Sequence, residues 1–108
     1  MIDIGVLELY AKRKESFMVS KMHITIEIDG EARALYVRLQ DGEIAKTIEY
    51  PEQQEIFLDL DGQGQLLGIE ILDPSDIDLA TILKNIAREY GIDDLSSLIY
   101  KSLVDLAA

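Results

Sequence analysis

The stretch IFLDLDGQGQLLGIEI, residues 56–71, decides the fold class because it has the pattern of two strands joined by a tight turn. Apolar residues alternate with other residues on both sides of the turn DGQG, residues 61–64, which is the period of strands with one buried face. Asp and Gly suit the positive φ angles that hairpin turns need. Gly68 lies inside the second run, where a glycine indicates a bulge or a close approach of the backbone to another group. We therefore predict an antiparallel hairpin over this stretch.

The residues before this hairpin repeat the same period. Residues 24–28 alternate and end at Asp29-Gly30, and residues 35–39 alternate and end at the dipeptide 41–42, Asp-Gly. Because Asp-Gly between two such runs is a strong hairpin signal, we expect residues 44–49 to return beside residues 35–39. The sequence thus predicts a sheet of four to five antiparallel strands built from hairpins, within residues 22–73.

After residue 73 the period becomes helical. Ser75 is placed to cap a first helix, and Gly91 suits the left-handed position that ends it. A second helix is expected after Asp93 or Asp94, and together the two occupy residues 75–107. The apolar stripes of the two helices are Leu79, Ile82, Leu83, Ile86 and Tyr90, and then Leu95, Leu98, Ile99, Leu103 and Leu106. A sheet followed by two C-terminal helices is an α+β fold, and we expect residues 22–108 to form one domain.

Residues 1–21 form a separate N-terminal segment by pattern. Their spacing indicates a short amphipathic helix, although residues 2–6 would serve equally well as a strand. Residues 12–14 are the only basic cluster in the chain, and Met22 precedes the first clear strand. We expect this segment to be the least essential part of the fold. The helical spacing runs through Ile2, Val6, Leu9, Tyr10, Arg13 and Phe17.

Composition and charge narrow the possible partners. The 108 residues include 21 acidic and 10 basic residues, a net charge of −11, which repels phosphate backbones and argues against direct nucleic-acid binding. The chain has no cysteine, which excludes disulfides and thiolate chemistry. No uninterrupted apolar run resembles a signal peptide or could cross a bilayer. We expect a cytoplasmic protein with no membrane partner, no cofactor, and a protein partner that is either a second copy or a basic chain.

Two blocks of the sequence resemble a known family. These are DGEARALYVRL, residues 29–39, and DLDGQGQLLGIEIL, residues 59–72, followed by Asp73-Pro74-Ser75. Together they are similar to the short bacterial and archaeal proteins grouped as domain of unknown function 2283, over about residues 22–76. Arg33 stands where the pattern of that family has an aspartate.

This resemblance implies a small sheet protein and no established activity. Some members of the family are encoded beside small toxin-like proteins, which suggests that they neutralise a partner. The family usually begins near the position of Met22, which again sets residues 1–21 apart.

A calcium-loop pattern is the sharpest candidate for a metal site. Asp59, Asp61 and Gln63 occupy positions one, three and five of such a loop, Gly64 position six and Glu70 position twelve. The known calcium loop is flanked by helices, however, whereas both flanks here have the period of strands. We therefore disfavour this site, and an Asp-Gly hairpin turn explains the same residues.

The remaining candidates favour interaction over catalysis. His23 is the only histidine, and the serines lack the context of a catalytic nucleophile, so we assign no catalytic residue. Tyr36, Arg38 and Phe57 are predicted on the sheet face away from the apolar side chains, where an aromatic residue beside an arginine is typical of interfaces. The leading hypothesis is a non-enzymatic interaction module, either a homodimer or a neutralising partner of a small basic protein. The alternative is a metal-binding or enzymatic domain that uses Asp59, Asp61 and Glu70.

Overall fold

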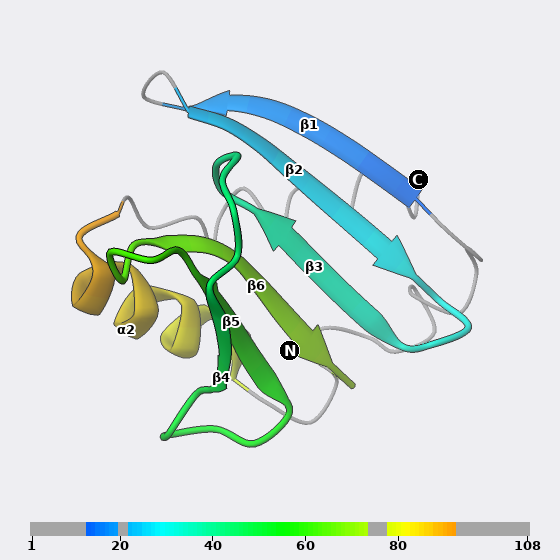
Figure 1. The fold of residues 1–108 in the computed structure, drawn as a ribbon. Helices are drawn as coiled ribbons and strands as arrows, with labels where there is room; N and C mark the ends of the chain where they lie inside the picture. Colours follow the sequence, from blue (N-terminus) through cyan, green and yellow to red (C-terminus); the bar gives the residue numbers. More distant parts are fainter. Residues whose placement is uncertain (1–12, 20–21, 74–77, 93–108) are drawn as a thin grey trace.

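The computed structural model shows an antiparallel sheet with a helix packed against one face, an α+β arrangement (Figure 1). It describes residues 13–19, 22–73 and 78–92. Within these residues the sheet has six strands in the order β1-β2-β3-β6-β5-β4, and every neighbouring pair is antiparallel. The elements are β1 (Arg13–Val19), β2 (Met22–Asp29), β3 (Ala34–Arg38), β4 (Lys46–Glu49), β5 (Ile56–Leu60), β6 (Leu66–Leu72) and α2 (Leu79–Tyr90).

The hairpin predicted over residues 56–71 is confirmed as β5 and β6. The Asp61 carboxylate accepts hydrogen bonds from the backbone N–H groups of Gln63 at 2.8 Å and Gln65 at 2.9 Å, which holds the turn closed. Gly64 has a φ of 81°, a left-handed conformation that favours glycine. The register shifts between Asp59, which faces Gly68, and Leu60, which faces Leu66, so the strand contains the predicted irregularity next to Gly68.

The hairpin predicted at Asp41-Gly42 is wrong. The neighbours of β3 are β2 and β6, and residues 44–49 do not return beside it. Residues 39–45 instead connect β3 to β4, and β4 lies at the edge of the sheet beside β5 (Figure 1). Backbone hydrogen bonds hold the two ends of this connection, from Leu39 N to Leu67 O at 2.8 Å and from Ala45 N to Leu60 O at 2.8 Å.

The composition of the two strands explains why β6, and not β4, pairs with β3. A strand in the middle of a sheet gains most when it brings several apolar side chains to the core. The strand β6 brings Ile69 and Ile71 opposite Val37 and Leu35, and all four are buried. The sequence of β4 is KTIE, in which Ile48 is the one apolar residue and is half-buried. This poor strand therefore lies at the edge, where short and charged strands are common.

The N-terminal segment contributes a strand where an amphipathic helix was expected. Residues Arg13–Val19 form β1, which pairs with β2 from Arg13 opposite Ile28 to Val19 opposite Met22. Within the described residues, the sheet therefore begins at Arg13 rather than at residue 22, and it has six strands rather than four or five. Helical spacing over a short segment is a weak signal when the edge of a neighbouring strand offers backbone hydrogen-bond partners, as β2 does for β1. Residues 1–12 lie outside the described part of the chain.

The first predicted helix is present as α2, with caps at both ends. The Asp78 carboxylate accepts hydrogen bonds from the Thr81 backbone N–H at 3.3 Å and the Thr81 hydroxyl at 2.7 Å. These bonds lower the pKa of Asp78. Gly91 ends the helix in the left-handed conformation with a φ of 68°, as predicted.

The described part of the chain differs from the prediction in its helices. The described residues contain one helix rather than two, because the second predicted helix, with Leu95 to Leu106, lies outside them. Ser75 also lies outside them, and the residue that caps α2 is Asp78 rather than Ser75. No helix in the described ranges has both the length and the apolar character needed to cross a bilayer.

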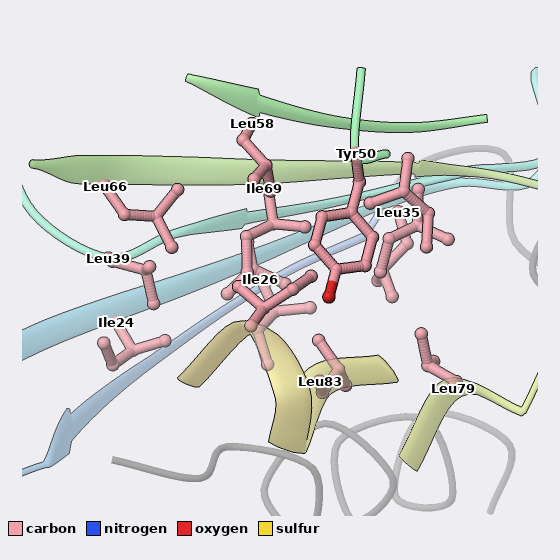
Figure 2. Close-up of a cluster of buried hydrophobic side chains, with 14 of the residues drawn as sticks. Ile24, Ile26, Leu35, Leu39, Tyr50, Leu58, Leu66, Ile69, Leu79 and Leu83 are labelled. Carbon is pink, nitrogen blue, oxygen red and sulfur yellow. The ribbon is translucent and has the colours of Figure 1, made fainter. Parts of the chain in front are cut away.

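The hydrophobic core lies between α2 and one face of the sheet (Figure 2). Tyr50, directly after β4, is also buried here, and its ring lies among the aliphatic side chains. Truncating one buried Leu or Ile to Ala typically costs about 2–5 kcal/mol, a large part of the stability of a small domain. The strand residues of the core are Ile24, Ile26, Ile28, Leu35, Val37, Ile56, Leu58, Leu60, Leu66, Ile69 and Ile71, and those of α2 are Leu79, Leu83 and Ile86.

The turn of the β5–β6 hairpin provides a test of this fold. We predict that Gly64→Ala lowers the free energy of unfolding by about 1 kcal/mol, because an L-residue is strained at positive φ. Gly62→Ala is the matched control, since a Cβ at either glycine meets no atom within 4 Å and only Gly64 has positive φ. Urea unfolding of both variants checks this, and equal losses would contradict the assigned turn geometry.

Candidate functional site

The candidate site is the polar face, the side of the sheet opposite the core. Strand pairing aligns its side chains in two rows that run across the strands. The first row contains Glu27, Tyr36, Glu70, Phe57 and Glu49, each directly opposite the next on neighbouring strands from β2 to β4. The second row contains Thr25, Arg38, Gly68, Asp59 and Thr47 in the same strand order.

The first row alternates carboxylates with aromatic rings. Directly opposite side chains in an antiparallel sheet have Cβ atoms about 4.5–5.5 Å apart, so each ring lies between two carboxylates. Tyr36, Phe57 and Glu70 are half-buried, whereas Glu27 and Glu49 at the two ends are exposed. The arrangement places aromatic surface and negative charge side by side, which suits a positively charged group.

In the second row, a glycine leaves space for the Tyr36 side chain. The hydroxyl of Tyr36 on β3 donates a hydrogen bond of 2.7 Å to Oδ2 of Asp59 on β5, although β6 lies between these two strands. The ring reaches across at Gly68, where an added Cβ would clash with the hydroxyl oxygen and lie 2.5 Å from Cζ. Gly68 is therefore needed for close approach, the second of the two roles expected from the sequence.

Two further contacts fix this tyrosine network. The hydroxyl of Thr47 on β4 donates to Oδ1 of Asp59, so both carboxylate oxygens of Asp59 accept hydrogen bonds. The guanidinium carbon of Arg38 lies 5.5 Å from the centre of the Tyr36 ring, a cation–π distance. Side chains from β3, β4 and β5 are thus tied together across the polar face.

The environment of Tyr36 keeps its hydroxyl protonated. Desolvation and the hydrogen bond to the negatively charged Asp59 both raise the pKa of Tyr36 above its ordinary value of 10.0, with Asp59 also disfavouring a second negative charge. The phenol is therefore a hydrogen-bond donor at neutral pH and is poorly suited to act as a base. Its role in this network is to hold the strands and the ring in place.

A second tyrosine joins the β4–β5 connection to α2. The hydroxyl of Tyr50 lies 3.0 Å from Oε2 of Glu52 and 3.2 Å from Oε1 of Glu89 on the helix. Desolvation, the hydrogen bond to Glu52 and the charge of Glu89 raise the pKa of Tyr50. Because the ring is in the core and the hydroxyl is at its rim, Tyr50 links sheet and helix.

The structure does not gather the residues of the predicted metal loop into one set of ligands. Asp59 accepts hydrogen bonds from Tyr36 and Thr47, Asp61 holds its own turn, and Glu70 lies in β6 opposite Tyr36 and Phe57. The described residues contain no group of three or more Asp, Glu or His side chains arranged to hold a metal ion. The expectation that this loop does not bind a metal ion specifically stays a prediction.

The three predicted interaction residues all lie on the polar face. Tyr36 and Phe57 flank Glu70 in the first row, and Arg38 lies in the second row beside the Tyr36 ring. Sequence reasoning missed Glu27, Glu49 and Thr47 because their neighbours depend on pairing between distant strands. Gly68 was the local signal of the network, since a glycine inside a strand indicates a close approach of another group. The group that approaches is the side chain of Tyr36, whereas the residue directly opposite Gly68 on β3 is Arg38. His23 lies in β2, opposite Met18.

Backbone conformation gives a reason for the aspartate that the family pattern has at the position of Arg33. This residue has a φ of 53°, in the left-handed region that Asp and Asn tolerate better than most residues. Arg33 O accepts a hydrogen bond of 2.8 Å from the backbone N–H of Asp73, which itself has a φ of 50°. An aspartate at position 33 thus suits the backbone of the turn between β2 and β3.

Comparison with known proteins agrees with this architecture. Residues 25–75, which include β3 to β6 and most of β2, match the family described as Protein of unknown function (DUF2283). The match confirms the family resemblance of the two hairpin blocks. Neither the curated proteins nor the solved structures gave a match.

The contact between Tyr36 and Gly68 is testable by a double-mutant cycle. We predict that Gly68→Ala lowers the free energy of unfolding by about 1–2 kcal/mol in the natural chain, because the ring must leave Asp59. In a Tyr36→Ala background the same change should be close to neutral, giving a coupling of about 1–2 kcal/mol. Urea unfolding of the four proteins measures it, and an equal loss in both backgrounds would show that Gly68 serves the bulge alone.

The tyrosines predict how stability changes in alkali. A raised pKa means that the folded state favours the neutral phenol, so this contribution is complete below the unfolded value of 10.0. As pH rises above that value, the unfolded chain ionises first and stability falls. We expect the urea midpoint to fall as pH rises above about 10, and to fall less in Tyr50→Phe and Tyr36→Phe. An unchanged slope in both variants would assign the alkaline loss to other groups.

Proposed function

We propose that the DUF2283 segment of this chain, residues 25–75, is a non-enzymatic interaction module that binds and neutralises a small basic protein through the polar face. The observation that carries this proposal is the first row, in which three carboxylates alternate with two aromatic rings across five strands. Aromatic rings supply contact area at interfaces, and neighbouring carboxylates select positively charged partners.

The charge of the polar face favours a basic partner over a second copy. Within the two rows, Glu27, Glu49, Asp59 and Glu70 are acidic and Arg38 is the one basic residue. Two such faces placed against each other would bring like charges together, which costs several kcal/mol in an interface. The net charge of −11 acts in the same direction over longer distances and would increase the rate of association with a basic chain.

The tyrosine network supports binding rather than chemistry at this face. Tyr36 is held by Asp59 and lies beside Arg38, so its ring is fixed before a partner arrives. Fixed side chains lose less conformational entropy on binding, which is an advantage for an interaction surface. A phenol kept neutral, beside a carboxylate whose two oxygens already accept hydrogen bonds, has little use as an acid–base pair.

Charge reversal at the centre of the first row tests this proposal. Tagged wild-type protein, Glu70→Lys and Glu43→Lys are used to isolate partners from the source cells, and recovered proteins are identified by mass spectrometry. Glu43 is the matched control because it is exposed in the 39–45 connection and its reversal changes net charge equally. We expect a partner with an isoelectric point above about 9 that is lost with Glu70→Lys and retained with Glu43→Lys.

Two results would contradict the proposal. Loss of the partner with both reversals would show that overall charge, and not the polar face, attracts it. Sedimentation equilibrium of the isolated protein addresses the alternative, because a stable dimer that dissociates in Glu70→Lys would identify the polar face as a self-association surface. The expected result is a monomer of 12.1 kDa in the absence of the partner.

A further inference from the structure

We infer that Phe57, with Glu49 on one side and Glu70 on the other, is a subsite for one arginine side chain of the basic partner. The inference rests on the proposed function, because it assigns a ligand chemistry to one part of the polar face. Its premise is the strand register, which places Glu49 of β4 and Glu70 of β6 directly opposite Phe57 of β5.

The three side chains lie side by side on neighbouring strands of the polar face. Neighbouring strands lie about 4.8 Å apart, so the backbone positions of the two glutamates are about 10 Å apart, with that of Phe57 between them. A guanidinium stacked on the ring could donate hydrogen bonds to either side, since it has five N–H donors in a planar fork. An ammonium is a compact point charge and cannot stack in this way, so the geometry favours arginine over lysine.

Phe57 is available for such a cation, whereas Tyr36 is already engaged. The guanidinium carbon of Arg38 lies 5.5 Å from the centre of the Tyr36 ring, and the Tyr36 hydroxyl donates a hydrogen bond to Asp59. That contact shows how an arginine from the chain itself lies against an aromatic ring of this face. Among the described residues, Phe57 makes no cation–π contact, and its ring is half-buried.

The place of the subsite in the sheet also allows entry. Phe57 lies one strand from the edge formed by β4, and Glu49 on that edge is exposed. The four-residue strand β4 covers little of the approach. A side chain of the partner can therefore reach the ring from the β4 side while the rest of the partner contacts the first row.

Peptides of equal charge provide the test. Octaarginine and octalysine are titrated against the full chain by calorimetry, with binding located by the NMR signals of the Phe57 ring. Phe57→Leu keeps an apolar side chain and removes the π face. We expect it to weaken octaarginine binding about three- to tenfold and octalysine binding less than about twofold, as a cation–π term of about 1 kcal/mol predicts.

Charge variants complete the design. The double variant Glu49→Gln with Glu70→Gln should weaken the binding of both peptides by more than about tenfold. The control is the double variant Asp41→Asn with Glu43→Gln, which loses the same charge on the 39–45 connection and should change binding less than about threefold. Urea midpoints within error of wild type establish that each variant is folded.

The outcomes separate this inference from the proposed function. Octaarginine binding that depends on Glu49 and Glu70 but not on Phe57 overturns the subsite and leaves the polar face as the interaction surface. Equal weakening of both peptides by Phe57→Leu overturns the preference for arginine. Ring signals of Phe57 that do not shift on titration, as expected if another segment or a second copy covers the ring, overturn the inference entirely.

Discussion

The pairing of β3 with β6 is the constraint on which the rest of the structure depends. It joins the strands β1, β2 and β3, which are consecutive in the chain, to the consecutive strands β4, β5 and β6, and so makes one sheet from two units. On the core face it brings Leu35 and Val37 opposite Ile71 and Ile69. On the polar face the same register brings Tyr36 opposite Glu70 and beside Gly68. One pairing therefore sets both the core and the candidate site.

Local patterns predicted most of the strands and the C-terminal end of α2, but they did not predict which strands are neighbours. The alternating runs, the turn at residues 61–64 and the cap at Gly91 depend on residues close in sequence, and these predictions are confirmed. The Asp41-Gly42 dipeptide is an equally strong local signal, yet it lies in an exposed connection. Burial of Ile69 and Ile71 beside β3 outweighs that signal, because a few tenths of a kcal/mol in a turn compete with several from buried side chains.

The sequence predicts the part of the candidate site that depends on the alternation of side chains along each strand. Alternation placed Tyr36, Arg38 and Phe57 on one face, and Gly68 indicated a close approach before any partner for it was known. The alternating row of carboxylates and rings could not be predicted, since it exists only when β2, β3, β6, β5 and β4 lie in this order. A register shift of one residue in any strand would move its members to the opposite face.

Glu70 is where the folding of this chain and its proposed interaction meet. The Glu70 side chain is half-buried between two aromatic residues, and it makes no hydrogen bond or ion pair with the other described residues. A carboxylate at this position therefore adds no ion pair to the described part of the fold, whereas an apolar side chain would add buried apolar area. An arriving cation would supply the missing interaction at a site that β3, β5 and β6 already hold in place. Under the proposed function, binding would then give Glu70 the ionic interaction that the described part of the fold does not give it, with little rearrangement of the strands around it.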